Sequence, residues 1–233
     1  VCSPMEPRMT DAAKQPKRQS RRNHAYDSFT EHLLARDILP GQFISQRELV
    51  DITGMSLGAI RELVPRLETD GLITTVPQRG MQIAHIDLDL VRNAFQLRIF
   101  LELEAIKLFT TTASNALLVK LRQDHEEIIE AAKHDITPEL LERAQNVDWA
   151  FHDCVIDSLE NAIISSIYKV NSIKIRLIRQ ERFRLNENLL RTVMQDHLKI
   201  IDCLEERAPD KVVNALRQHL ENARGRALGL GEM

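Results

Sequence analysis

Aromatic residues and cysteines are scarce in this chain of 233 residues. Phe, Trp and Tyr make up 4% of it, which argues against a β-sandwich or a β-barrel, whereas residues that favour helices are abundant. The cysteines Cys2, Cys154 and Cys203 are odd in number and widely spaced, which is typical of a reducing cytosol and of neither a disulfide framework nor a cysteine-based zinc site. No apolar run approaches the roughly 20 residues of a membrane helix, and the start lacks the apolar core of a signal peptide. We therefore expect a mainly α-helical, cytoplasmic protein without a membrane partner.

A strong net charge is also missing, since the formal charge is −3. That average hides a basic stretch from Lys14 to Arg22, with five basic residues and no acidic one, whereas residues 81–233 carry 20 Lys and Arg against 24 Asp and Glu. A basic segment beside a more acidic body suits a DNA-binding protein whose second domain has another task, and a solvated polar tail explains the charges equally well. The polar composition of residues 1–22 predicts a disordered basic tail.

Residues 23–84 follow the order of a winged helix-turn-helix. The capping box Ser45-Gln-Arg-Glu48 predicts a helix start, and two short β-prone runs, 72–76 and 81–84, flank a turn and predict a hairpin. Helix, helix, turn, helix and hairpin within about 60 residues predict this DNA-binding domain. The three helices are expected from Asn23 to Pro40, from near Gln46 to Gly54, and from Ser56 to Gly71.

In such a domain, the helix that begins at Ser56 enters the major groove with its N-terminal residues nearest the bases. Arg61 lies one to two turns into that helix, from where a guanidinium reaches guanine O6 and N7 or a phosphate. Arg47, in the preceding helix, is placed for the DNA backbone or the groove edge, and Arg79 with Gly80 at the hairpin tip is placed for the minor groove. Each of these residues, taken alone, is equally well explained as an ordinary exposed side chain. The order of the elements around them favours DNA contact.

Residues 26–84 resemble the DNA-binding domain of the GntR family of bacterial regulators. The resemblance implies DNA contacts by Arg47 and Arg61, and the wing glycine of the family at Gly80. One departure is Leu57, where the family commonly has a basic residue, in a segment where Gly58 also differs from the family pattern. A second is Pro65 inside the third helix, where proline costs about 3 kcal/mol and usually kinks the helix. The motifs that carry the resemblance are Pro40-Gly41, Glu48-Leu49, Ser56, Arg61-Glu62, Arg66-Leu67-Glu68, Asp70-Gly71-Leu72 and Arg79-Gly80.

Everything after Ile86-Asp87 has the pattern of helices. Six or seven helices joined by short loops predict an all-helical bundle. We assign residues 85–90 to a linker and residues 91–228 to this second domain. The candidate helices cover residues 88–112, 114–133, 138–158, 161–185, 187–207 and 210–228.

Four polar residues of this domain stand where helical periodicity expects apolar ones. Asp148 and His152 are four apart and share a helix face, while His197 and His219 interrupt apolar stripes on two later helices. Both of these histidines lie eleven residues from position 208, or about 16 Å along each helix, so antiparallel neighbours would hold them at one level. Three imidazoles and a carboxylate suit Zn²⁺, Ni²⁺ or another divalent transition metal. Each histidine taken alone is more readily a core residue, and the other five histidines show no such arrangement.

Residues 88–228 resemble the FCD ligand-binding domain of the FadR-like branch of the GntR family, through "DWAFHDCVIDS", "DHLKIIDCL" and "ALRQHLENA". The resemblance implies metal-ligand roles for Asp148, His152, His197 and His219. Arg98, in "LRIFLELEA", resembles the inward arginine of the family, and a partly buried guanidinium suits a small carboxylate ligand. An ion pair with Glu102, four residues on, accounts for Arg98 equally well.

The sequence thus predicts a DNA-binding transcription regulator, not an enzyme. We expect a homodimeric repressor that binds a double-stranded DNA operator and responds to a small carboxylate held beside a divalent metal. In one alternative the metal is structural or is itself the signal. In the other alternative the bundle is a metal-dependent enzyme. An enzyme would leave the winged helix unexplained, and no additional general base stands out in the sequence.

Overall fold

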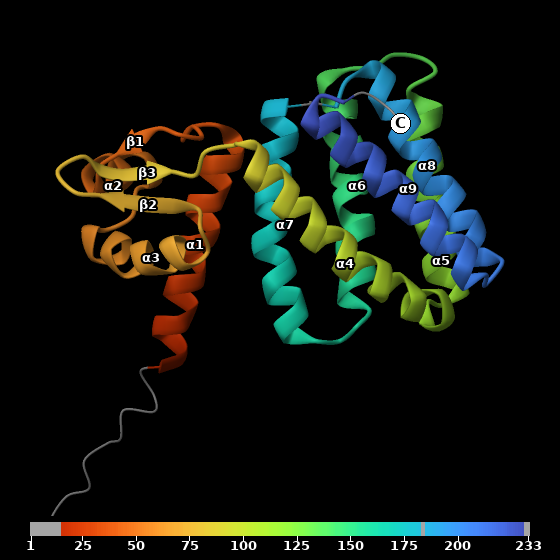
Figure 1. Ribbon diagram of the computed structural model, residues 1–233, viewed down its shortest axis with the longest axis horizontal. Helices are drawn as coiled ribbons and strands as arrows, with labels where there is room; N and C mark the ends of the chain where they lie inside the picture. The colour runs from red at the N-terminus through yellow and green to blue at the C-terminus, as the bar shows by residue number, and fades with distance from the viewer. Residues whose placement is uncertain (1–14, 183–184, 231–233) are drawn as a thin grey trace, which may run out of the picture. The chain divides into compact units, whose positions relative to one another are not determined.

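The computed structural model describes residues 15–182 and 185–230 of the chain. Across these residues it holds nine helices and one three-stranded sheet (Figure 1). They form two compact units, and the chain passes from the first to the second between His85 and Ile86. The mainly α-helical class and its two parts, a winged helix-turn-helix followed by an all-helical bundle, are confirmed.

The first unit contains the helices and the hairpin that the sequence predicts. Its elements are α1 (Gln15–Ala35), β1 (Phe43–Ile44), α2 (Gln46–Thr53), α3 (Leu57–Thr69), β2 (Ile73–Val76) and β3 (Gly80–Ile83). Helix α1 starts earlier than predicted, so residues 15–22 belong to a helix and not to a disordered tail. Pro16 fits there because proline is tolerated in the first turn, where its missing N–H has no helical acceptor. Residues 1–14 of the predicted tail lie outside the described residues.

Local hydrogen bonds explain where α2 and α3 begin. The Ser45 hydroxyl accepts the N–H of Glu48, and the Glu48 carboxylate accepts the N–H of Ser45 at 2.7 Å, so the predicted capping box is present. The Ser56 hydroxyl accepts the N–H of Ala59 at 3.3 Å and caps α3 in the same way. Helix α3 continues through the exposed Pro65, because its buried face anchors it on both sides of the proline, through Ile60, Leu63, Val64 and Leu67.

The small sheet has the order β1-β3-β2, with both pairs antiparallel. The sequence predicts β2 and β3 but not β1, which has only two residues and no alternation to recognise. Gly80 explains how β3 approaches β1: its φ is +89°, and a Cβ there would lie 2.9 Å from the carbonyl oxygen of Ile44. Gly80 is therefore required by the packing of the wing.

The second unit is the predicted bundle of six helices. They are α4 (Leu88–Thr112), α5 (Asn115–Ala131), α6 (Pro138–Asp157), α7 (Ala162–Arg182), α8 (Glu187–Glu205) and α9 (Pro209–Leu228). Helix α4 begins at Leu88, inside the segment 85–90 that the sequence assigns to a linker, because the Asp87 carboxylate accepts the N–H of Leu90 and caps the helix.

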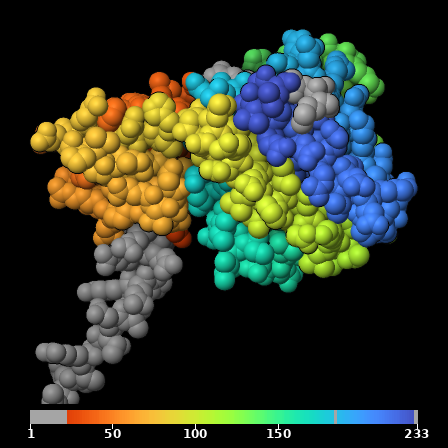
Figure 2. Space-filling model, in the orientation of Figure 1, coloured from red at the N-terminus to blue at the C-terminus, as the bar shows by residue number. Residues whose placement is uncertain are grey.

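The core of this bundle is divided by a polar layer. Helix α6 packs against α4, α5, α7 and α8, and α9 packs against α4, α7 and α8. One apolar cluster includes Phe151, Ile200 and Leu216, and the other includes Ala144 and Val193. Along α6 and α8 the buried polar residues lie between these two clusters, which places the layer inside the bundle. On the face shown in Figure 2, the described side chains of α4 and α9 meet without a visible opening.

Within the described residues, no helix is both long enough and apolar enough to cross a membrane.

Candidate functional site

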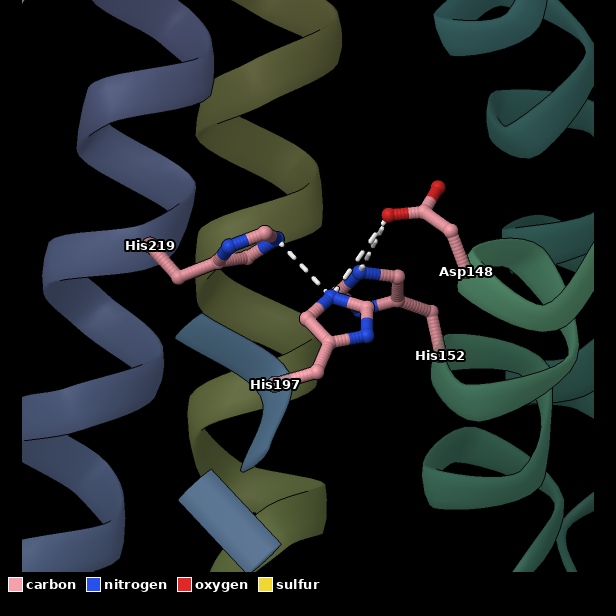
Figure 3. A group of neighbouring side chains, drawn as sticks. All are labelled: Asp148, His152, His197 and His219. Carbon is pink, nitrogen blue, oxygen red and sulfur yellow. Dashed lines mark hydrogen bonds and ion pairs between the residues drawn. The ribbon is translucent and has the colours of Figure 1, made fainter. Parts of the chain in front are cut away.

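Four buried side chains converge inside the bundle, and they are the four that the sequence singles out. Asp148 and His152 come from α6, His197 from α8 and His219 from α9, and each residue is at most 3% exposed (Figure 3). One ligand atom of each lies within 4.8 Å of the others. The Nε2 atom of His197 is 3.2 Å from Nε2 of His219 and 3.5 Å from Oδ1 of Asp148, and Nε2 of His152 is 4.0 Å from the same oxygen.

The spacing of His197 and His219 about position 208 explains why they meet. Helices α8 and α9 pack together and are joined by the short turn before Pro209, so residues equidistant from the turn lie at one level. The contact of 3.2 Å between their rings bears out the antiparallel arrangement on which that spacing argument depends.

A carboxylate fixes the protonation of His152. Its Nδ1 lies 2.7 Å from Oε2 of Glu102, which can only accept a hydrogen bond while ionised, so Nδ1 carries the proton. Glu102 is ionised because Arg98 and His152 outweigh its burial, which alone would raise its pKa, and the pKa is lowered to about 2. The lone pair of His152 therefore lies on Nε2, which is buried and has no hydrogen-bond partner among the described residues.

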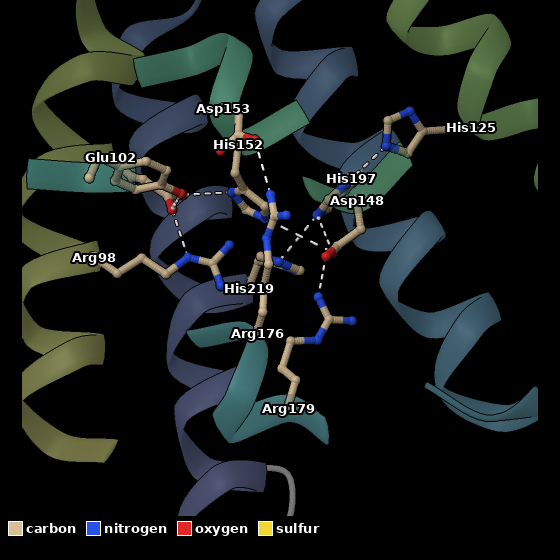
Figure 4. A network of polar contacts seen from close by, with 11 residues as sticks. Arg98, Glu102, His125, Asp148, His152, Asp153, Arg176, Arg179, His197 and His219 are labelled. Atoms are coloured by element: carbon tan, nitrogen blue, oxygen red, sulfur yellow. Dashed lines mark hydrogen bonds and ion pairs between the residues drawn. The ribbon is translucent and has the colours of Figure 1, made fainter. Parts of the chain in front are cut away.

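His125 fixes the protonation of His197. The sequence analysis does not assign His125 to the site. The Nδ1 atom of His125 donates to the carbonyl oxygen of Leu121 at 2.6 Å, which leaves the lone pair on its Nε2. That Nε2 lies 2.9 Å from Nδ1 of His197 and accepts its proton, so the lone pair of His197 lies on Nε2, towards Asp148 (Figure 4). His125 is fully buried in an apolar stripe of α5 with Leu121 and Ile128, which is the pattern that identified His197 and His219. The same criterion applied to every helix would have found it.

Charged partners complete the surroundings of the remaining two side chains. Arg179 of α7 forms an ion pair with Oδ2 of Asp148, which leaves Oδ1 directed towards the histidines. Asp196, one residue before His197, has its carboxylate 3.8 Å from Nδ1 of His219. His152, His197 and Asp148 are thus oriented by neighbours that the sequence analysis did not assign to the site, whereas Nδ1 of His219 has no hydrogen-bond partner among the described residues.

Burial also sets the charges of the site. Desolvation, followed by the charge of Arg98, lowers the pKa of His152 to about 4, and desolvation with the neighbouring imidazoles lowers the pKa of His197 well below its usual range. Burial alone would raise the pKa of the Asp148 carboxyl, but Arg179 and His152 bring it below its usual range. Near neutral pH these two imidazoles are therefore neutral and Asp148 is ionised, which is the state in which such groups bind metals.

The residues present fit a divalent transition metal. The Nε2 lone pairs of His152 and His197 and one carboxylate oxygen of Asp148 are directed at one small volume. Ligand atoms about 2.1 Å from a tetrahedral metal lie about 3.4 Å apart, close to the contacts that His197 makes with Asp148 and His219. Imidazole nitrogens and a carboxylate are ligands that Zn²⁺ and Ni²⁺ accept.

Arg98 lies beside this cluster and is already paired. Its Nε donates to Oε1 of Glu102 at 2.6 Å, and the hydroxyl of Tyr168 donates to the same oxygen at 2.6 Å. The sequence allowed two roles for Arg98, a carboxylate-binding role and an ion pair with Glu102. The ion pair is present. The arginine also borders a cavity of about 10 Å³ that His152 lines, which is room for about one water molecule.

The five residues expected at DNA lie on the elements from which they were predicted. Arg47 on α2 and Arg61 on α3 are exposed, and Ser56 is exposed as the cap of α3. The guanidinium of Arg79, in the turn between β2 and β3, stacks over the ring of Phe43 at 4.4 Å. Gly80 has the structural explanation given above, and nothing in the described contacts tests a DNA-contacting role for any of them.

Known proteins resemble the chain in both parts. Residues 21–83 match the bacterial regulatory proteins of the gntR family, and residues 93–222 match the FCD domain. The HTH-type transcriptional repressor RspR of Escherichia coli is 28% identical over 199 residues, which cover 81% of this chain and 83% of the relative. The Glc operon transcriptional activator of Escherichia coli is 24% identical over 201 residues, which cover 77% and 78%.

A solved structure, that of Escherichia coli McbR/YncC, has the same fold, with a TM-score of 0.69 at 16% identity over 86% of this chain and 93% of the other. The matched family and both of these relatives are transcriptional regulators, which decides against the metal-dependent enzyme considered from the sequence.

Proposed function

Because the chain belongs to the GntR family of bacterial regulatory proteins and carries an FCD domain, it is a DNA-binding transcription regulator, and we propose that a small carboxylate bound beside a divalent metal controls its binding to operator DNA. One observation carries this proposal. It is the convergence of Asp148, His152, His197 and His219 inside the FCD domain, next to a cavity bordered by the Arg98 guanidinium.

On the DNA side, the first turns of α3 enter the major groove. Arg61 is exposed there and contacts a base edge or a phosphate, and Ser56, whose side chain caps the helix, lies close to the backbone. Arg47 on α2 contacts the groove edge, and Arg79 with Gly80 reaches the minor groove from the wing. Leu57 offers no charge to the DNA, so the operator contacts differ from those of relatives with a basic residue at this place.

On the ligand side, Asp148, His152, His197 and His219 hold a zinc or nickel ion. When bound, such an ion would supply a Lewis acid for a carboxylate oxygen, which would be an additional ligand beside the four protein side chains. Glu102, His125 and Arg179 keep His152, His197 and Asp148 oriented through the hydrogen bonds and the ion pair described above.

Arg98 orients the carboxylate that enters this site. The residue is 4% exposed and its side chain borders the cavity, while its Nε remains bound to Glu102. Because the cavity accommodates about one water molecule, a carboxylate enters only when neighbouring side chains move. This movement is the local event that links the ligand to the rest of the domain.

Control of DNA binding requires that the carboxylate bind the DNA-competent and the DNA-free states with different affinities. We propose a homodimer on a pseudo-palindromic operator, because two-fold symmetry in the protein matches two half-sites. Exposed apolar side chains on the bundle support association, with Phe100 of α4 at 66% exposure and Ile163 of α7 at 73%. We propose a repressor, as the RspR relative is named, although the activator relative shows that both signs occur among similar proteins.

Thermal unfolding of the metal-loaded chain in the presence of small carboxylates, with and without a chelator, tests the ligand site. A ligand at 100 times its dissociation constant adds about 2.7 kcal/mol to the free energy of unfolding, which shifts the transition visibly. We expect a stabilising carboxylate whose effect disappears after chelation. The same screen with His134→Ala, an exposed histidine outside the cluster, is the control for His219→Ala, which abolishes the effect.

A second candidate function is favoured by the ion pair of Arg98 with Glu102, since a guanidinium that is already neutralised has less to offer a ligand. In that case the metal is structural or is itself the signal. A large loss of stability on chelation, together with no response to any carboxylate, would favour this view over the first.

A further inference from the structure

The outer wall of the cavity beside His152 holds a second guanidinium. Arg176 of α7 lines the same cavity as Arg98 and His152, together with Asp153 and Trp149 of α6. Its NH2 atom lies 3.3 Å from Oδ2 of Asp153 (Figure 4). The flat guanidinium also stacks over the indole of Trp149, 4.2 Å from the ring centre. Two arginines from different helices, α4 and α7, thus border one internal space.

The outer wall is the part of the cavity that is able to move. Arg98 and His152 are almost completely buried, whereas the side chain of Arg176 is 24% exposed and that of Asp153 is 43% exposed. A partly exposed ion pair with one contact is held weakly, because water competes for both charges. Rotation of Asp153 into solvent leaves Arg176 with a free position for another carboxylate.

Two buried hydrogen-bond donors in this wall have no acceptor among the described residues. They are the indole N–H of Trp149 and the Nε–H of Arg176. Buried donors are almost always paired in folded proteins, so two of them beside one cavity point to an acceptor that comes from outside the chain. A carboxylate is such an acceptor, and it also matches the positive charge of Arg176.

We propose that the ligand is a small dicarboxylate, with one carboxylate at the metal and Arg98 and the other on Arg176. This inference rests on the proposed function and names the ligand class of the same site. In the present structure Asp153 occupies the place of the second carboxylate, so it is an internal competitor that the ligand displaces from Arg176. A monocarboxylate uses only the inner guanidinium and leaves the outer ion pair closed.

Titration calorimetry on the zinc-loaded chain of 233 residues tests this proposal. The probes are linear dicarboxylates of three to six carbons, from malonate to adipate, and monocarboxylates of the same lengths. We expect one dicarboxylate to bind at least about tenfold more tightly than its matched monocarboxylate, which corresponds to one charge-assisted hydrogen-bond contact. Equal or weaker binding by every dicarboxylate would overturn the proposal.

Two variants separate the outer guanidinium from the rest of the site. Arg176→Gln removes the charge, and we expect it to weaken the preferred dicarboxylate by about tenfold while the matched monocarboxylate changes by less than about twofold. Asp153→Asn removes the internal competitor, and we expect several-fold tighter dicarboxylate binding. Arg143→Gln, an exposed arginine of α6 that does not line the cavity, is the control for the lost charge and leaves both affinities unchanged.

The zinc content of each variant is measured at the same time and stays equal to that of the parent chain. If monocarboxylates and dicarboxylates bind equally, and Arg176→Gln weakens neither, the proposed ligand class is wrong while the metal-assisted carboxylate site stands. If the zinc-loaded chain binds no carboxylate of either kind, the proposed effector function fails together with the ligand class.

Discussion

His125 gives the sharpest test of how the chain prepares its metal site. Its ring is fully buried and connects the carbonyl oxygen of Leu121 to Nδ1 of His197, over distances of 2.6 and 2.9 Å. In His125→Leu, the Nδ1–H of His197 has no acceptor while Nε2 remains a ligand. A buried donor without an acceptor costs about 1–3 kcal/mol. The imidazole avoids this cost by moving its proton to Nε2, where it faces Asp148 and no metal binds.

Either response weakens zinc binding, because metal binding requires the lone pair on Nε2. We expect the dissociation constant of zinc to rise about 10- to 100-fold in His125→Leu, the range found when a residue that orients a metal ligand is lost. In His125→Gln the side-chain oxygen takes approximately the place of Nε2 and accepts the same proton, so we expect much of the affinity to be retained. Competition with a chromogenic chelator measures the zinc dissociation constants of the parent chain and of both variants.

His134→Leu is the matched control, since His134 is an exposed histidine in the turn after α5. We expect zinc binding of this variant to equal that of the parent chain. Unchanged zinc affinity in His125→Leu would refute the argument that a proton on Nδ1 of His197, held by His125, keeps Nε2 available.

Three further predictions concern the DNA-binding unit and the metal cluster. Arg61→Ala is expected to lose specific operator binding by about tenfold or more in footprinting, with unchanged metal content, and retained protection would contradict the placement of α3 in the groove. Gly80→Ala, whose Cβ meets the carbonyl oxygen of Ile44, is expected to destabilise its unit by about 2 kcal/mol or more in urea unfolding; Gly54→Ala, at φ +67° with open space around it, is expected to cost about 1 kcal/mol. His219→Ala is expected to release zinc, measured by elemental analysis after dialysis, and stoichiometric zinc in this variant would exclude it as a ligand.

Local patterns were sufficient to predict most of the fold. Caps such as Ser45 and Ser56 locate helix starts because they satisfy the first N–H groups within three residues. The sequence does not predict strand β1, because two residues are too few to show an alternating pattern. The strand is defined by its pairing with β3. Helix α1 begins earlier than the sequence predicts, because a polar, basic composition is typical of disorder as well as of an exposed helix, and Pro16 is compatible with a first helical turn.

For the site, the sequence predicted side chains that lie on one helix face or at matched distances from a turn. It did not predict partners that meet only when distant helices pack. Arg179 reaches Asp148 across α6 and α7, and Arg176 reaches Asp153 across the same pair of helices, without any sequence spacing that relates them. His125 is different, because its position in an apolar stripe of α5 is a pattern that the sequence itself shows.

Direct measurement of DNA binding tests whether a carboxylate at the metal changes the affinity of this regulator for its operator. An operator selected from random duplexes is the probe. The dissociation constant of the complex between the zinc-loaded chain and this operator is measured with and without the carboxylate that stabilises the chain most. We expect the carboxylate to change this constant about fivefold or more, and we expect the change to be lost on chelation and in His219→Ala. A DNA affinity that depends on the metal and is the same with every carboxylate would show that a carboxylate does not control operator binding.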